Sequence, residues 1–197
     1  MKIEELIKHN PILQKIYDIL KPYLIDQNIE VYKLEDLQKF GFKPRPTVIA
    51  CALPPNKLFF SYLPDPVTFA HELIHLCKKP NDIDEEIYGY NLATIIIFMA
   101  EREIRANPFK LFQLSIEQIE SILRKYGFNS IEEFYEVQGI IPHTHKLTID
   151  EKGRLKFVRD KRYSDKDIVI TFVTEISAGL PYFPICEKIL IDLLEFC

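Results

Sequence analysis

The sequence lacks the features that would place the protein among nucleic-acid-binding or membrane proteins. Acidic residues outnumber basic ones, 29 against 25, so the chain as a whole has no broad electrostatic attraction to a phosphate backbone. The longest apolar run, residues 92–100, is too short to cross a bilayer, which needs about 20 residues. The opening residues, MKIEELIKHN, include two glutamates and no long apolar core, so we expect no signal peptide or targeting helix. These absences predict a cytoplasmic protein with no nucleic-acid or membrane partner.

The sequence also lacks any closely spaced pair of cysteines. Its four cysteines are widely scattered and include no CxxC motif: Cys51, Cys77, Cys186 and Cys197. Local spacing therefore supports neither a zinc ribbon nor a redox motif, and we expect free thiols. Cys77 lies two residues after His75 and could approach a metal bound there, although a buried small side chain is its expected role.

What remains is a chain of 197 residues, 47% of them hydrophobic, which is long enough for one core or for a small domain with a substantial appendage. Asp65 can cap a helix that begins at Pro66, because proline is tolerated in the first helical position. Periodicity and turn residues predict the following elements in the first half: one kinked or two consecutive helices within residues 2–25, a strand at 28–34, a short helix at 34–40, a β-hairpin from runs 47–53 and 57–63, and helices at 66–79 and 84–103.

The character of the sequence changes after about residue 105, and no catalytic pattern follows. The predicted elements are two helices that open with serine at 115 and 130, a hairpin turning at residues 150–153, a β run at 167–176 and a final helix at 186–196. His143 and His145 flank Thr144 and could form a second metal pair, but we expect this stretch to be an exposed loop.

The segment HELIH, residues 71–75, places two histidines four positions apart in a predicted helix. Residues at this spacing share one helical face, with Cβ atoms about 5 to 6 Å apart, so His71 and His75 can direct ring nitrogens at one zinc ion. Glu72 lies about 100° further round the helix, which suits a base that acts on water at the metal. An apolar stripe on the opposite side gives the helix a core face: Phe69, Leu73 and Leu76.

A catalytic zinc generally has three protein ligands, so the site needs one more. Glu85 and Glu86 are the candidates, because they begin the next predicted helix, which must fold back after a short turn. Glu85 follows Asp82 by three residues and can belong to a capping box. Glu86 shares a helical face with Gly89 and Ala93, small residues that allow close approach of the two helices, and is therefore the predicted ligand. A solvated helix start is the alternative role of this glutamate pair.

HELIH followed by EIYGYNLA resembles the gluzincin metallopeptidases, in which HExxH on one helix is completed by a glutamate on the next. The similarity is closest to the soluble archaeal minigluzincins. It implies an α+β fold with a zincin-like catalytic domain in residues 1–105, made of an N-terminal helix, a small sheet, the HExxH helix and the glutamate helix, and a C-terminal α+β extension in residues 106–197. The pattern departs from related families at Tyr90, where Asp or Asn is frequent.

The resemblance also implies zinc-dependent hydrolysis of peptide bonds. We expect KLFFSYL, residues 57–63, to supply a sheet edge that holds an extended peptide or unfolded-protein substrate by strand addition. Zinc would lower the pKa of a bound water from about 15.7 towards about 7, and Glu72 would transfer a proton from that water to the leaving amine. Tyr88 and Tyr90 are candidates to stabilise the oxyanion, with packing between helices as the alternative.

Two further interpretations belong to a different functional class. The chain can be a latent or regulatory zinc module whose site is occluded, or the zinc can be purely structural. A fourth protein ligand such as Cys77 or His145 would favour these interpretations, whereas an open position beside Glu72 favours an enzyme. Because residues 106–197 have no catalytic pattern, we expect them to restrict access to the cleft, as in a zymogen, or to bind a partner. The sequence does not specify the oligomeric state.

Overall fold

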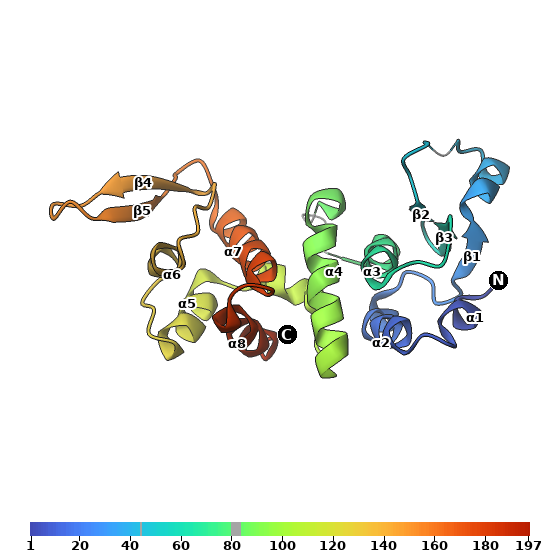
Figure 1. Ribbon diagram of the computed structural model, residues 1–197, viewed down its shortest axis with the longest axis horizontal. Coiled ribbons are helices and arrows are strands. Elements are labelled where there is room, and N and C mark those ends of the chain that lie inside the picture. Colours follow the sequence, from blue (N-terminus) through green and yellow to red (C-terminus); the bar gives the residue numbers. More distant parts are fainter. Residues whose placement is uncertain (44, 80–83) are drawn as a thin grey trace. The chain divides into compact units, whose positions relative to one another are not determined.

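Helices account for most of the regular structure and two small sheets for the rest, so the predicted α+β class is confirmed. The computed structural model describes residues 1–43, 45–79 and 84–197, without the side chains of residues 85–87. The chain divides into two compact units, Met1–Arg105 and Ala106–Cys197, whose elements are labelled in Figure 1. Within the described residues, none of the helices combines the length and the hydropathy that a bilayer-spanning segment needs.

The unit Met1–Arg105 begins with two consecutive helices, as predicted, because Asn10 caps the second of them and Pro11 opens it. The predicted hairpin and short helix are also present, the latter as a 3₁₀-helix. The elements are α1 (Ile3–Ile7), α2 (Pro11–Leu20), η1 (Lys21–Tyr23), β1 (Glu30–Lys33), η2 (Leu34–Phe40), β2 (Ala50–Leu53), β3 (Lys57–Phe60), α3 (Pro66–His75) and α4 (Glu85–Arg102).

The three strands of this unit form a sheet in the order β1-β3-β2, with β1 parallel and β2 antiparallel to β3. The expectation that residues 57–63 form a sheet edge is therefore wrong, because β3 has a strand on each side. The outer edge of β1 is also occupied: Ile3 donates its N–H to the Ile29 carbonyl, and Val31 donates to the Met1 carbonyl. In the described part of the unit, β2 is the strand whose outer edge pairs with no other strand.

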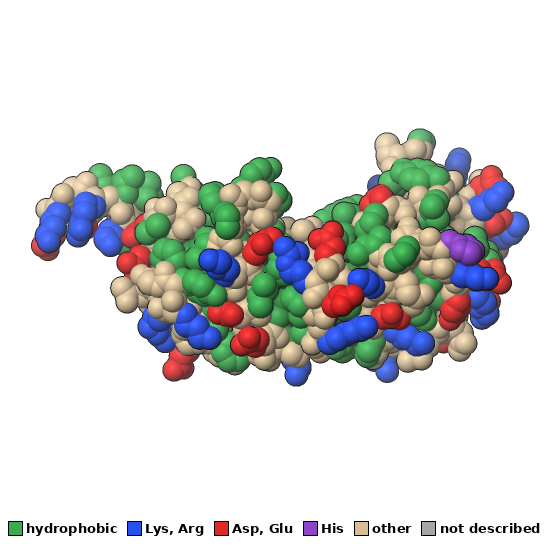
Figure 2. Space-filling model, turned by 60° about the horizontal axis from the view of Figure 1, so that its bottom comes forward, with side chains coloured by type: hydrophobic (Ala, Val, Ile, Leu, Met, Phe, Trp, Pro, Cys, Tyr) green, Lys and Arg blue, Asp and Glu red, His purple; other side chains and the backbone are tan. Residues whose placement is uncertain are grey.

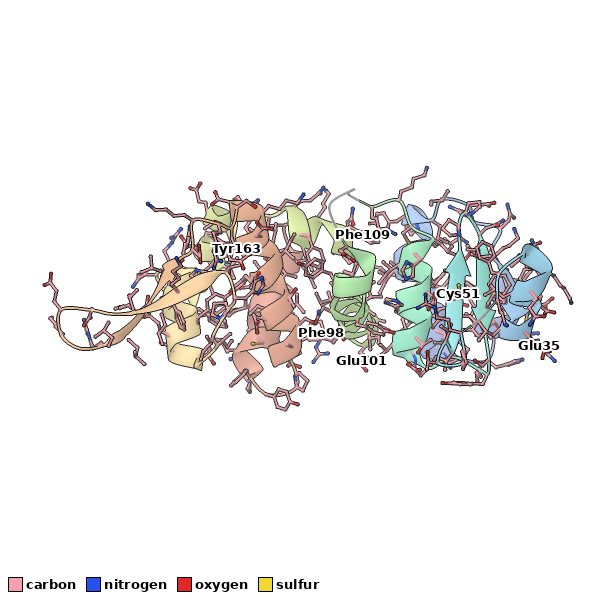
Figure 3. The ribbon with its side chains drawn as sticks, turned by 90° about the horizontal axis from the view of Figure 1, so that it is seen from above. Glu35, Cys51, Phe98, Glu101, Phe109 and Tyr163 are labelled. Atoms are coloured by element: carbon pink, nitrogen blue, oxygen red, sulfur yellow. The ribbon has the colours of Figure 1, made fainter. Side chains whose placement is uncertain are left out.

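Alternation along β3 gives the sheet two different faces. Phe59 is buried against Leu34 and Leu37 of η2. Phe60 points the other way, and its ring centroid is 6.5 Å from that of Phe69 on α3. Figure 3 shows the sheet between α3 and η2, with Cys51 on the sheet and Glu35 on η2. The sheet thus supports α3 from one side.

Helix α3 begins as predicted, because the Asp65 carboxylate accepts hydrogen bonds from the N–H groups of Val67 and Thr68. The predicted apolar stripe of Phe69, Leu73 and Leu76 is completely buried. The helix ends at His75 rather than near residue 79. Its end is fixed by pairing with the segment after η1: Ile25 donates its N–H to the Leu76 carbonyl, and Lys78 donates to that of Tyr23. This pairing leaves His75 in the last helical turn.

The unit Ala106–Cys197 contains the two predicted serine-capped helices, the predicted hairpin and the predicted final helix. Ser115 and Gln118 form a reciprocal capping box, and Ser130 caps the next helix. The elements are η3 (Pro108–Gln113), α5 (Ile116–Lys125), α6 (Ile131–Gln138), the antiparallel strands β4 (His145–Ile149) and β5 (Leu155–Arg159), α7 (Asp165–Gly179) and α8 (Pro184–Leu194).

The β run predicted at residues 167–176 is wrong, because this stretch lies inside helix α7. Ser164 and Asp167 form a capping box that starts the helix. The apolar residues from Ile168 to Val173 are buried on nearly every side of the helix. The apolar residues of such a run recur with neither the helical nor the strand period, so periodicity cannot distinguish the two structures. The β-branched residues favoured a strand, whereas packing in the folded unit favours a helix.

The expectation of an exposed loop around His145 is also wrong, although His143 is exposed. Thr144 is fully buried, and His145 is 7% exposed. The His145 Nε2 is 2.9 Å from a carboxylate oxygen of Glu132 on α6, and Arg159 donates to the same carboxylate. Both ends of the hairpin are thereby anchored to α6.

The tip of the hairpin extends into solvent, as the blue Lys and Arg side chains at the left end of Figure 2 show. Ile149 is 71% exposed and Leu155 is 61% exposed. A two-stranded ribbon with such exposure is not stable alone. Contacts with α6 therefore support it, namely the charged cluster at its base and Glu136, which accepts the Phe157 N–H.

Acid should loosen this anchor through Glu132. Burial raises the pKa of the Glu132 carboxyl, but hydrogen bonds from His145 and Arg159 outweigh burial and hold the pKa at about 2, below its ordinary value of 4.5. The resulting stabilisation, at most about 3 kcal/mol, is complete above pH 4.5 and is lost as the pH falls towards 2. Urea titrations followed by circular dichroism measure the unfolding free energy at each pH. Between pH 4.5 and pH 2 this free energy should fall less steeply in Glu132→Gln than in the parent, whereas the exposed control Glu151→Gln should behave as the parent does. Equal dependence on pH in the two variants would contradict the prediction.

Candidate functional site

The two histidines of HELIH converge at one point on α3. Their Nε2 atoms are 3.2 Å apart, and their rings are nearly perpendicular, with an interplanar angle of 88°. Two nitrogen ligands of a tetrahedral zinc lie roughly 3.3 to 3.4 Å apart when each Zn–N distance is about 2.0 to 2.1 Å. The separation between His71 and His75 therefore fits a shared zinc ion. His71 is 4% exposed, so its ring is held by packing as well as by its place on the helix.

Helix α4 holds the ring of His71 through two consecutive residues. A Cβ atom at Gly89 would lie 2.7 Å from His71 Nδ1 and 2.8 Å from Cε1, so only glycine allows this approach. The ring of Tyr90 stacks on that of His71, with centroids 4.2 Å apart and an interplanar angle of 11°. The close approach predicted from the small residue at position 89 is thus present.

A cleft of about 420 Å³ opens over the histidines. Its floor is α3, its wall is the segment of residues 47–52 that leads into β2, and Tyr90 of α4 completes it. Glu72 also lines the cleft, although it is only 8% exposed. The predicted base and both predicted histidine ligands therefore face one space that is large enough for a few atoms of a bound chain.

The edge strand beside this cleft is β2 rather than β3. Residues 47–52 line the cleft, whereas no residue of β3 is among the lining residues described for it. The small side chains of Ala50 and Ala52 leave the backbone of β2 close to the cleft. Strand addition, if it occurs here, would use the outer edge of β2.

The third predicted ligand lies outside the described residues, because the side chains of Glu85 and Glu86 are not described. Among the side chains that are described, no group of three His, Cys, Asp or Glu residues is placed to hold a metal. The backbone of α4 shows on which face of the helix residue 86 lies. Residue 86 precedes Gly89 by three positions and therefore lies on the same face of α4, the face that meets His71.

The two predicted tyrosines are placed differently. Tyr90 lines the cleft and is 57% exposed, whereas Tyr88 is not among the lining residues described for it. The Cys77 thiol is buried and donates to the Leu73 carbonyl, which agrees with its expected role as a small core residue. Cys77 likewise is not one of the cleft-lining residues.

Sequence reasoning missed Thr68 and the wall at residues 47–52. Thr68 lines the cleft one turn before His71, and helical periodicity applied backwards from the histidines would have found it. Its hydroxyl donates to the Asp65 carboxylate at 2.7 Å. The wall had no local signal, because its place depends on which strand lies at the sheet edge.

A scan against protein-family models finds no match to this chain, and searches of curated proteins and of solved structures find none either. The geometry of the cleft and the motif within it are therefore the features that indicate a function.

Tyr90 should contribute to metal affinity through its ring rather than its hydroxyl, because the ring stacks flat on that of His71. Tyr90→Ala should weaken zinc binding by about tenfold, the lower end of the effect of losing a group that orients a ligand. Tyr90→Phe keeps the stacked ring and should bind zinc as the parent does. Competition with a chromogenic chelator measures both affinities. A loss in the Phe variant equal to that in the Ala variant would assign the effect to the hydroxyl instead.

Proposed function

We propose that the protein is a zinc-dependent peptidase of the gluzincin type, similar to the minigluzincins, with a zincin-like arrangement in Met1–Arg105. The observation that carries this proposal is the 3.2 Å separation of the His71 and His75 Nε2 atoms in a cleft that Glu72 also lines. Two converging imidazoles beside a nearly buried carboxylate form the donor set and base that hydrolytic zinc sites use. The enclosing packing by α4 also supports a site that is preorganised for a metal.

In this proposal His71, His75 and Glu86 hold the zinc ion. Zinc in such a site acts as a Lewis acid and lowers the pKa of water towards about 7. Glu86 is preferred over Glu85 because it shares the face of α4 that carries Gly89, and Gly89 lies against the ring of His71. The histidine pair alone leaves coordination positions for a third protein ligand and for water or substrate.

The chain's own residues supply proton transfer and orientation. Glu72 accepts a proton from the attacking water and delivers it to the amine that leaves, so one carboxyl serves as base and then as acid. Stacking of the Tyr90 ring on the His71 ring restrains the side of the cleft that α4 completes. Tyr90 can also offer its hydroxyl to the developing oxyanion, since it is the tyrosine of the two candidates that lines the cleft.

The proposed substrate is a peptide or an unfolded protein in an extended conformation. Such a chain can pair with the outer edge of β2, where backbone groups face the cleft and the alanine side chains are small. This replaces the edge first expected from residues 57–63. The proposal includes neither a nucleic-acid nor a membrane partner, and its expected setting is the cytoplasm.

A zinc site closed by a fourth protein ligand is the alternative, and it would make the chain a regulatory or structural zinc module. The two residues suggested for that role have other partners. The Cys77 thiol donates to the Leu73 carbonyl, and both ring nitrogens of His145 have partners in its own unit, Thr144 and Glu132. These contacts favour the enzyme. The role of Ala106–Cys197, as a cover for the cleft or as a partner-binding unit, stays a prediction.

The roles of ligand and base can be separated by substitution. Glu72→Gln should retain about one zinc per chain while cleavage of casein falls by at least about 100-fold, because a general base typically contributes 10²- to 10⁴-fold. His71→Ala should lose both zinc and cleavage. Elemental analysis and a fluorescent casein assay measure these quantities. Glu101→Gln, an exposed change on α4, is the control and should alter neither. Full activity in Glu72→Gln, or full zinc occupancy in His71→Ala, would refute the assignment.

The third ligand can be identified by comparing Glu86→Ala with Glu85→Ala. Loss of a residue that only orients a ligand typically reduces metal affinity by roughly 10- to 100-fold, and loss of a direct ligand should reduce it by more. We expect Glu86→Ala to reduce zinc affinity by more than about 100-fold and Glu85→Ala to have a small effect. Chelator competition provides the affinities, and circular dichroism checks that both variants are folded. The reverse order of affinities would make Glu85 the ligand.

A further inference from the structure

The unit Met1–Arg105 has, besides the cleft, a groove of about 900 Å³ at one end of the sheet. Strand register defines this end: Lys33 pairs with Phe60 at the ends of β1 and β3, and Phe60 pairs with Ala50 at the start of β2. The groove is lined by residues at and beyond these positions, together with Met1, Leu6, Val31 and Tyr32. It therefore lies where the chain leaves β1 and β3 and enters β2.

Most of the residues that line this groove are apolar, and some of their side chains are exposed. Val31, Leu34 and Phe60 line it and are buried. Four charged residues also line it: Lys33, Glu35, Asp36 and Arg45. Tyr62 is 58% exposed and Leu63 is 65% exposed, and both line it. Exposed apolar surface gathered around a concavity is a feature of binding sites.

The groove lies next to the cleft over the histidines, since Val48 lines both. The cleft follows residues 47–52, and the groove begins where that segment reaches the end of the sheet. Six residues of extended chain span about 20 Å at roughly 3.3 Å per residue. An extended chain of this length that lies along β2 therefore runs well past the four residues of that strand.

We propose that this groove binds one aliphatic or aromatic side chain of a polypeptide that lies extended along β2. The proposal rests on the proposed function and adds a determinant of substrate choice that is remote from the cleaved bond. A polypeptide is the occupant because only a connected chain can use the β2 edge and the apolar groove together, and Val48 lines both spaces.

The test uses quenched-fluorescent peptides of twelve residues with a uniform polar background and a single Phe moved one position at a time. The full zinc-loaded chain should cleave one of these peptides with a kcat/KM roughly tenfold above that of the peptide with Ser at the same position, the scale of discrimination by an apolar pocket. Leu63→Arg should abolish this preference, so that the Phe and Ser peptides are cleaved with the same kcat/KM. Ile141→Arg, a change at a residue of the other unit that is 76% exposed, should leave the preference intact.

Binding of the same labelled peptides, measured by fluorescence anisotropy in the presence of a chelator, separates the two proposals. If no peptide is cleaved but the Phe peptide binds more tightly and Leu63→Arg removes that difference, the groove is upheld and the peptidase proposal fails. If peptides are cleaved without any preference for the position of Phe, or if Leu63→Arg preserves the preference, the groove proposal is overturned and the peptidase proposal stands. Absence of both cleavage and selective binding overturns both.

Discussion

The close approach of α4 to α3 at Gly89 is the contact on which the candidate site depends. A single added carbon at this position would lie 2.7 Å from His71 Nδ1, so the two helices can meet only because residue 89 has no side chain. This approach places Tyr90 against the face of the His71 ring and brings the residue 86 side of α4 towards the histidines. Completely buried residues further along α4, including Leu92, Ala93 and Ile96, hold the helix there. The apolar core therefore sets the geometry of a polar site.

The second constraint is the order of the strands. Because β1 is covered at its outer edge by residues 1–3 and β3 lies in the middle, β2 is the described strand that presents its edge to the cleft. The same order brings the start of β2 beside the ends of β1 and β3, where the apolar groove lies. One feature of topology thus decides both where a substrate backbone would lie and which hollow its side chains would meet.

Local signals explain what the sequence predicts correctly. The cap at Asp65, the histidine spacing in α3 and the small residue at position 89 depend on contacts within a few residues or on helical periodicity, and each is present in the structure. The errors involve long-range packing. Helix α7 is buried on nearly every side, so its sequence has no period that distinguishes helix from strand. The ring of the buried His145 lies within hydrogen-bond distance of Glu132, 13 residues before it, and the same carboxylate accepts from Arg159, 14 residues after it. No local pattern around residues 143–145 indicates those partners.

Stacking by Tyr90 has a thermodynamic consequence for the whole unit. A ligating histidine needs its ring fixed in orientation, which a neighbouring polar group commonly provides. Here the flat contact with Tyr90 and the backbone at Gly89 contribute that restraint by packing. If zinc binds at the proposed site, its affinity and the docking of α4 on α3 are coupled, since a metal that binds only the packed arrangement stabilises it by mass action. Because α4 also packs on α2, this coupling reaches the N-terminal helices, far in sequence from the histidines. A metal bound at His71 and His75 would accordingly stabilise the entire fold of Met1–Arg105 rather than the cleft alone.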